Sequence, residues 1–260
     1  MRLDKALYGT LITGHLSFDT LVKVLVRLGF EANPVDPCVM NKTVDGNQLT
    51  VVIYVDDILA TCVSAEAITW LLDELTAEFD EVKGGLSDDF SYLGMHVRCG
   101  VGMTWVSMEG YESDVIEYAN ITGVRSSPAT ASLFDVGTSR PLAPREREEF
   151  HTITAKLLYL IQRTRPDIAL AVSYLTTRAT CANVDDMSKL RRVLMYMNGS
   201  AGRGLTLSCE GPLRVSNYVD VAFGVHDDGK SHTAEVKRLG EEATVSAKST
   251  KWPRTPPRPS

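Results

Sequence analysis

The sequence predicts an α+β fold built in three consecutive segments, and three observations carry this prediction. Residues 1–125 alternate helical and strand-like hydrophobic patterns, typical of an antiparallel sheet with packed helices. Residues 126–204 begin with a linker rich in turn residues and continue with helical patterns. Residues 205–251 contain short strand-like runs that predict an incomplete β region. The remaining residues, 252–260, form a proline- and arginine-rich tail that we expect to be disordered.

The composition limits the classes of protein. Of the 260 residues, 44% are hydrophobic and 23% are charged, which allows an ordinary core. No apolar run is long enough to span a membrane, and the first residues are not an apolar signal region, so we expect an intracellular, cytoplasmic protein. The five cysteines include no CxxC pair, which favours neither a zinc site nor a disulfide framework. The net charge of −6 counts mildly against nucleic-acid binding, for which a basic face is usual.

In the first segment, hydrophobic residues at helical spacing predict two helices, over residues 16–30 and 65–79. Gly29 is a plausible end for the first helix, and Ser64 is a plausible N-cap for the second. Short apolar runs predict four strands, over residues 49–55, 58–63, 92–97 and 103–108. The run over 49–55 is almost continuously apolar, which predicts a strand covered on both faces.

The other segments follow the same rules. Helices are predicted over residues 145–164, 167–179 and 185–198. Strands are predicted over residues 205–208, 213–223 and 232–239. Asp227-Asp228-Gly229 has the composition of a hairpin turn between the last two strands.

The strongest chemical signal is the pair of adjacent carboxylates Asp56 and Asp57, where one apolar strand ends and the next begins. A bare Asp-Asp pair is most often a simple turn, because Asp hydrogen-bonds nearby backbone. Here the turn has little polar padding, so both carboxylates stand at the rim of a buried sheet. Two like charges this close favour a neutralising cation, and Mg²⁺ is the usual partner of carboxylate oxygens where phosphates are handled.

Tyr54-Val55-Asp56-Asp57 between two apolar strands resembles the YVDD form of motif C of reverse transcriptases. Further blocks follow in the order found in the Pol polyproteins of copia-type retrotransposons. These blocks are residues 5–9, 28–30, 34–39, 92–94, 157–160, 164–167, 193–199, 218–220 and 229–233. The ordered series covers roughly residues 3–251 and is more specific than any single block.

The resemblance implies a partial reverse-transcriptase palm in residues 1–125, a helical thumb or connection segment in 126–204, and the start of a ribonuclease H-like domain in 205–251. It implies an RNA-directed DNA polymerase that uses two divalent metal ions, with Asp56 and Asp57 as catalytic Mg²⁺ ligands. Tyr54, Tyr92, Leu93 and Gly94 would contact the template-primer, Gly94 by allowing close backbone approach. Asp220 would be a metal ligand of a vestigial ribonuclease H site. Without the resemblance, an ordinary structural role would be favoured for Tyr54, for the 92–94 block and for Asp220.

The same resemblance implies that the partners are an RNA or DNA template-primer and a dNTP. No membrane partner is expected. The resemblance also shows departures. The family draws another catalytic Asp from an upstream strand and further acidic residues from the later part of ribonuclease H, and these 260 residues offer no counterpart to either. Residues 10–15 replace a block that lies near the incoming nucleotide. We therefore expect a fragment of a transposable element, lacking upstream Pol segments and inactive as an isolated chain.

Two other functions stay open. The chain could be a non-catalytic or domesticated remnant that binds nucleic acid or a protein partner. It could also be an unrelated metal hydrolase with two carboxylates, although no further acids, bases or ligands for such a site can be identified.

Overall fold

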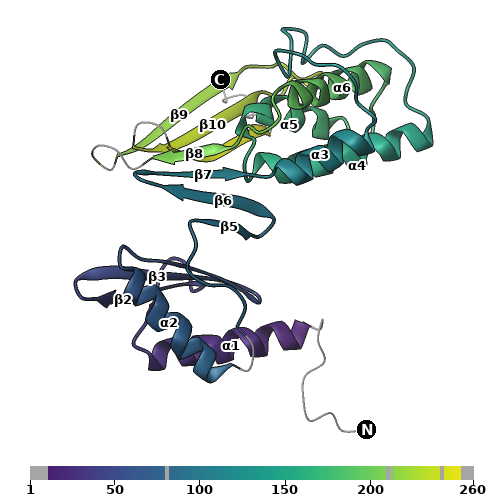
Figure 1. Cartoon of the computed structure of the whole chain (residues 1–260). Helices are drawn as coiled ribbons and strands as arrows, with labels where there is room; N and C mark the ends of the chain where they lie inside the picture. Colours follow the sequence, from purple (N-terminus) through teal and green to yellow (C-terminus); the bar gives the residue numbers. More distant parts are fainter. Residues whose placement is uncertain (1–10, 80–81, 209–211, 213, 241–242, 253–260) are drawn as a thin grey trace, which may run out of the picture. The chain divides into compact units, whose positions relative to one another are not determined.

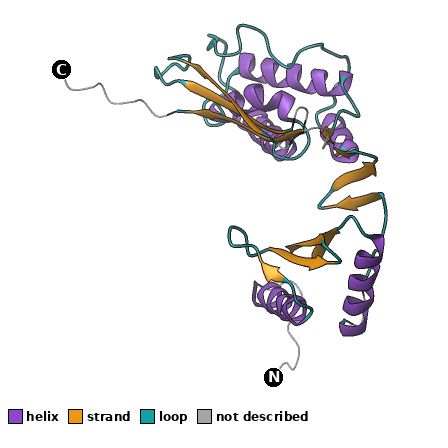
Figure 2. Cartoon of the chain, turned by 90° about the vertical axis from the view of Figure 1, so that its left-hand side faces the viewer, coloured by secondary structure: helices purple, strands orange, loops and turns teal. Residues whose placement is uncertain are grey.

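The computed structural model describes residues 11–79, 82–208, 212, 214–240 and 243–252, with side chains from His15 onward. The chain forms two compact units, Met1–Asp88 and Asp89–Ser260, and each is described by itself. Both units combine antiparallel strands with helices (Figures 1 and 2). The predicted mixture of helices with antiparallel sheets is therefore confirmed. The boundaries predicted at residues 125 and 204 stay predictions.

The first unit contains a four-stranded antiparallel sheet in the order β1-β2-β3-β4. Its strands are β1 (Glu31–Ala32), β2 (Val39–Val44), β3 (Asn47–Tyr54) and β4 (Asp57–Thr61). Along β3, Leu49, Val51 and Ile53 are buried, while the alternate residues are half-buried or exposed. The two strands predicted on either side of the carboxylate pair are confirmed. The expected cover on both faces is wrong for the described residues, because side chains bury only one face of β3.

Two helices cover the buried face of this sheet. They are α1 (Leu11–Arg27) and α2 (Ala65–Glu78). α2 matches the prediction over residues 65–79 closely, whereas α1 begins five residues before and ends three residues before the predicted 16–30. Leu21 and Leu25 of α1 share one hydrophobic cluster with Leu71 and Leu75 of α2 and with the buried side of β3. The β3–β4 hairpin is therefore anchored by packing of β3 against both helices.

The ends of these helices follow from their local sequence. Gly29 has a φ of 86°, and the hydrogen bonds from its N–H to Val26 and from the Phe30 N–H to Leu25 form a Schellman ending. Ser64 Oγ accepts a hydrogen bond from the Ala67 N–H at 3.1 Å and so caps α2. The predicted helix end at Gly29 and the predicted N-cap at Ser64 are both confirmed.

The second unit begins with a hairpin that continues into a four-stranded antiparallel sheet in the order β5-β6-β7-β8. Its strands are β5 (Asp89–Tyr92), β6 (Met95–Gly100), β7 (Met103–Ser107) and β8 (Leu205–Ser208). The strand predicted over residues 92–97 is wrong as one element, because a turn at Leu93 and Gly94 divides it. β8 comes from almost one hundred residues further along the chain and pairs with β7, so this sheet joins distant parts of the sequence.

Helices form the main body of the second unit. They are α3 (Glu109–Tyr118), α4 (Pro144–Ile161), the 3₁₀ turn η1 (Pro166–Ile168), α5 (Ala169–Thr177) and α6 (Val184–Gly199). The three helices predicted from sequence correspond to α4, to η1 with α5, and to α6. α3 was not predicted, because its acidic sequence has a weak hydrophobic pattern.

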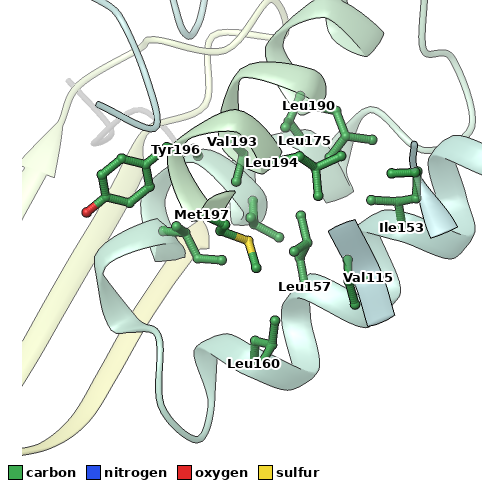
Figure 3. Close-up of a cluster of buried hydrophobic side chains, with 14 of the residues drawn as sticks. Val115, Ile153, Leu157, Leu160, Leu175, Leu190, Val193, Leu194, Tyr196 and Met197 are labelled. Atoms are coloured by element: carbon green, nitrogen blue, oxygen red, sulfur yellow. The ribbon is translucent and has the colours of Figure 1, made fainter. Parts of the chain in front are cut away.

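These helices bury a common apolar core, shown in Figure 3. Val115 of α3 faces Leu157 and Leu160 of α4, and Val193 and Leu194 of α6 close the cluster (Figure 3). All five side chains are at most 1% exposed. Full burial of a side chain of this size stabilises the folded state by about 1.5–3 kcal/mol.

The segment predicted as a linker, residues 126–143, is irregular but packed against α6 and the residues before it. Leu133 and Leu142 are buried in the helical core. The Leu142 N–H donates to the carbonyl of Ala182 at 3.0 Å, and Asn183 Nδ2 donates to the carbonyl of Gly137 at 2.9 Å. The segment is therefore part of the second unit's packing rather than a free tether.

A three-stranded antiparallel sheet in the order β11-β10-β9 completes the unit. Its strands are β9 (Val215–Ala222), β10 (His232–Leu239) and β11 (Ala243–Lys251). The strands predicted over residues 213–223 and 232–239 are confirmed as β9 and β10, to within two residues at each end. The predicted turn between them is also confirmed, because the Gly229 N–H donates a hydrogen bond to the carbonyl of His226. β11 was not predicted, because its alanine, serine, threonine and lysine residues lack apolar alternation. Three antiparallel strands occur in many folds, so the ribonuclease H-like character stays a prediction.

None of the helices in the described part of the chain has the length and apolar character that crossing a bilayer requires.

Gly204 allows β8 to approach β7, and its replacement should destabilise the second unit. A Cβ at Gly204 would overlap the backbone carbonyl oxygen of Val106, which cannot move aside without disturbing the sheet. We expect Gly204→Ala to lower the free energy of unfolding by about 1–3 kcal/mol, measured by urea denaturation. Gly110→Ala is the matched control, because a Cβ on that helical residue meets nothing within 4 Å. Equal stability of the two variants would contradict the role of Gly204.

A buried histidine pair connects the three-stranded sheet to the helical core. His226 Nε2 and His232 Nδ1 lie 3.0 Å apart, and His232 Nε2 lies 2.7 Å from Ser249 Oγ. Both histidines are buried, and Phe134 and the ring of Tyr174 pack against the pair. Burial, and then the neighbouring His226 and Lys251, lower the pKa of His232 to about 4.

Acid should therefore destabilise the second unit. Between the ordinary histidine pKa of 6.5 and about 4, the unfolded chain binds a proton at residue 232 that the folded chain does not. We expect this residue to lower the free energy of unfolding as pH falls through that window, by up to about 1.4 kcal/mol per pH unit. His232→Gln should flatten the dependence in denaturation measured at several pH values. The exposed His151→Gln control should retain it, and an unchanged slope in His232→Gln would disprove the assignment.

Candidate metal-binding turn and associated residues

The two carboxylates occupy a tight hairpin between β3 and β4. Tyr54 pairs with Asp57 in the last rung of the ladder, so Val55 and Asp56 alone make the turn. Val55 has a φ of 55°, a left-handed conformation that is costly for a β-branched residue. The buried side chains of β3 hold this turn in place. Core packing therefore positions Asp56 and Asp57, which do not lie on a long loop.

Both carboxylates of the turn are exposed to solvent, as are the neighbouring side chains of Tyr54 and Val55, each 55% exposed. Carboxylate oxygens are ligands that Mg²⁺ prefers, so the donor set of Asp56 and Asp57 fits a hard divalent cation. Within the described residues, no group of three or more His, Cys, Asp or Glu side chains is arranged to hold a metal ion. The described part of the candidate site is therefore a pair of adjacent, exposed carboxylates.

The block resembling a primer-contact region forms a second tight turn, in the second unit. Tyr92 pairs with Met95, and the two turn residues Leu93 and Gly94 have φ values of 50° and 76°. Positive φ at both central residues is the pattern of a type I′ hairpin. A Cβ on Gly94 would make only ordinary contacts, 3.8 Å from Met108 Cε and from Tyr159 Oη. The positive φ of Gly94 thus favours glycine here, and the predicted close approach of the primer backbone stays a prediction.

Asp220 lies on β9, opposite Ala234 of β10. Its side chain is exposed, and Oδ1 accepts a hydrogen bond from the Val221 N–H at 2.9 Å. The structure therefore groups the predicted residues by hairpin. Tyr54, Asp56 and Asp57 share one turn of the first unit, whereas the 92–94 turn and Asp220 belong to different sheets of the second unit.

Sequence reasoning missed the side chains that surround the Leu93–Gly94 turn. Tyr159 of α4 reaches this turn, and its ring contacts Tyr111 of α3 and the guanidinium of Arg163. A signal for part of this set was present, because Tyr159 and Arg163 are four residues apart in a helical pattern. No signal pointed to Tyr111, since α3 itself was not predicted.

Comparison with known proteins identifies the class. Residues 1–131 match the family described as reverse transcriptase (RNA-dependent DNA polymerase). This match covers half of the chain and includes both strained turns. The chain therefore belongs to the reverse transcriptase family.

Individual relatives refine this assignment. The chain is 26% identical over 249 residues to the retrovirus-related Pol polyprotein from transposon TNT 1-94 of Nicotiana tabacum. The matched region covers 89% of this chain and 18% of the relative. The chain is 26% identical over 246 residues to the retrovirus-related Pol polyprotein from transposon RE2 of Arabidopsis thaliana, covering 92% of this chain and 16% of the relative. The putative transposon Ty5-1 protein of Saccharomyces cerevisiae is 24% identical over 231 residues, covering 87% of this chain and 74% of the relative.

The chain thus spans less than a fifth of the length of the two plant polyproteins. No solved structure matches it. The predicted resemblance to the reverse transcriptase of copia-type retrotransposon Pol polyproteins is confirmed. The roles predicted for individual residues stay predictions.

The strain at Val55 can be measured. Asn tolerates positive φ better than a β-branched residue, and the exposed Val55 side chain contributes little burial. We expect Val55→Asn to raise the free energy of unfolding of the chain by about 1 kcal/mol in urea denaturation. Val63→Asn is the control, because Val63 is 89% exposed and is not among the residues with positive φ. A loss of stability in Val55→Asn would show that the turn is unstrained.

Proposed function

We propose that this chain is the part of an RNA-directed DNA polymerase that carries the Asp56–Asp57 metal-binding turn. One observation carries the proposal: in a chain of the reverse transcriptase family, two adjacent carboxylates occupy a strained turn held on a packed sheet. Backbone strain in a costly conformation persists where the surrounding structure enforces it, often at functional sites.

In this proposal, Asp56 and Asp57 hold a divalent ion, with Mg²⁺ as the expected cofactor. The ion would supply charge neutralisation at the phosphates and activation of the attacking hydroxyl. Tyr54, on the same hairpin, presents its half-exposed ring beside the carboxylates as a contact for the template-primer. The partners are accordingly an RNA or DNA template-primer and a dNTP.

The Tyr92, Leu93 and Gly94 turn would contact the primer in the same proposal. Its two central residues lie beyond Tyr92 and Met95, the last pair of the β5–β6 ladder. Asp220 is a separate proposal, as a metal ligand of a ribonuclease H-like site in residues 205–251. The exposure of its side chain on β9 supports access by an ion, although no acidic cluster forms around it within the described residues.

We further propose that the pair does not suffice for nucleotidyl transfer by the chain alone. A two-metal centre needs more oxygen ligands than two adjacent side chains supply, and the described residues bring no third acidic side chain to this turn. Under this proposal the chain contributes two metal ligands and a surface for the template-primer to the polymerase. The runner-up, a non-catalytic remnant, shares this expectation but does not require a metal at the turn.

Metal binding can be tested with Mn²⁺, whose unpaired electrons broaden nearby NMR signals. We expect Mn²⁺ to broaden the amide signals of Asp56, Asp57 and Ile58 first. The Asp56→Asn/Asp57→Asn variant should lose this localised effect, because amides are poorer ligands than carboxylates for a hard cation. Asp45→Asn, which changes an acid in the neighbouring β2–β3 turn, should retain it. Equal broadening in wild type and the double variant would refute the metal-binding role.

Primer extension on an RNA template with Mg²⁺ and dNTPs tests the second proposal. We expect no incorporation by the isolated chain, because the described ligand set is incomplete. Incorporation that disappears in Asp56→Asn but persists in Asp45→Asn would overturn the proposed insufficiency and would directly support catalysis at the turn. Incorporation unaffected by both substitutions would exclude Asp56 from the reaction.

A further inference from the structure

We propose that a row of tyrosines and cations on α3 and α4 binds a nucleic-acid strand through ring stacking and phosphate contacts. This row, called here the tyrosine–cation row, consists in spatial order of Tyr118, Lys156, Tyr111, Tyr159 and Arg163. The inference rests on the proposed function, since it supplies a surface for the nucleic-acid partner. It does not require the metal-binding turn, which lies in the other unit.

The row is continuous from end to end. Lys156 Nζ lies 5.6 Å from the ring centroid of Tyr118 and 5.7 Å from that of Tyr111. The rings of Tyr111 and Tyr159 are 5.2 Å apart and tilted by 47°. The guanidinium carbon of Arg163 lies 3.8 Å from the Tyr159 ring centroid. Each neighbouring pair is therefore within the range of aromatic or cation–π contact.

Helical spacing produces this arrangement. Lys156, Tyr159 and Arg163 are separated by three and four residues, so they follow one side of α4 and the turn after it. Tyr111 and Tyr118 are seven residues apart, two turns of α3, and so share one side of that helix. Figure 3 shows the inward sides of the same helices, where Val115, Leu157 and Leu160 enter the core.

The row lies at the edge of this core. Tyr118 is 53% exposed, and the other four side chains are half-buried, with the rings of Tyr111 and Tyr159 packed partly against the core. Partial burial, and then the neighbouring Tyr159, raise the pKa of Tyr111, so its hydroxyl stays neutral and can donate a hydrogen bond. The apolar packing of α3 against α4 depends on the inward residues. The exposed ring of Tyr118 and the exposed parts of the other four side chains are thus available to a ligand.

One end of the row adjoins the turn already proposed to contact the primer. Tyr159 Oη would lie 3.8 Å from a Cβ on Gly94, and Arg163 stacks on the same ring. A strand that contacts the Leu93–Gly94 turn would therefore meet Tyr159 and Arg163 next. This continuity favours a nucleic-acid strand over an unrelated ligand.

The chemistry of the row matches such a strand. Tyrosine rings stack on bases without sequence preference, at about 1–3 kcal/mol per base, and Lys and Arg neutralise phosphates. Asp114 lies between Tyr111 and Tyr118 on the same side of α3, so it opposes phosphate binding at that end. Two cations opposed by Asp114 predict weak, salt-sensitive and sequence-tolerant binding.

The test uses the full chain and a fluorescein-labelled poly(dT) strand, followed by fluorescence anisotropy at several salt concentrations. We expect Lys156→Gln/Arg163→Gln to weaken binding about tenfold or more at low salt. The slope of log affinity against log salt should become shallower by about 1.4, because two phosphate contacts are lost. Tyr118→Leu should weaken binding about fivefold, since it removes the most exposed ring of the row.

Matched variants separate binding from folding. Arg145→Gln/Arg147→Gln makes the same charge change at exposed positions on α4 outside the row and should leave affinity within twofold, that is about ±0.4 kcal/mol. Asp114→Asn should tighten binding, a gain that a misfolded protein would not show. Lys156→Gln/Arg163→Gln should retain the Mn²⁺ broadening at Asp56 and Asp57, so a failed row and a failed metal-binding turn are distinguishable. Absence of binding by the wild type, or equal loss in the two double-glutamine variants, would overturn the inference.

Discussion

The second unit depends on one buried cation, the guanidinium of Arg165, which is 0% exposed. Its Nη1 donates to Glu112 at 2.8 Å, its Nε and Nη2 donate to Asp167 at 3.0 Å each, and Nη2 also donates to Ser200 at 2.7 Å. A buried charge costs several kcal/mol unless such partners surround it. The partners come from α3, from η1 and from the end of α6, so the hydrogen bonds of Arg165 link these three elements. The cation thereby helps to hold α3, which carries part of the tyrosine–cation row.

The two acids around Arg165 are unequal partners. Burial alone would raise the pKa of Asp167, but the hydrogen bonds and charge of Arg165, with the hydroxyl of Tyr196, outweigh burial and hold the pKa below its usual value. Burial dominates at Glu112 and raises its pKa despite the contact with Arg165. Asp167 is therefore the carboxylate that Arg165 stabilises in its charged form. Keeping the Glu112 carboxyl group charged costs free energy. Such a network contributes specificity of packing more than net stability.

The sequence predicted the periodic parts of the fold and missed those whose order comes from tertiary contacts. The helices around Leu71 and Leu157 follow from hydrophobic spacing, and the hairpin at Asp56 follows from two apolar runs joined by acids. α3 escaped prediction because burial of Glu112 against Arg165 and of Val115 in the core, rather than an amphipathic stripe, fixes it. β11 escaped because pairing with β10 orders a polar strand. At the candidate site, the acids were predictable, but the dihedral angles of their turn were not.

The dihedral angles of the turns support the candidate site independently of the resemblance to reverse transcriptases. In the described residues, four non-glycine positions have positive φ: Asp45, Val55, Leu93 and Asn120. Asp and Asn tolerate this conformation because their short polar side chains bond locally, so Asp45 and Asn120 need no special cause. Val55 and Leu93 have no such relief, and each is held by a tight antiparallel hairpin. The two costly positions fall in the two turns that the family resemblance assigns to metal and primer contact. Gly or Asn would relieve the backbone strain at both positions, so Val55 and Leu93 place a cost in stability in these two turns.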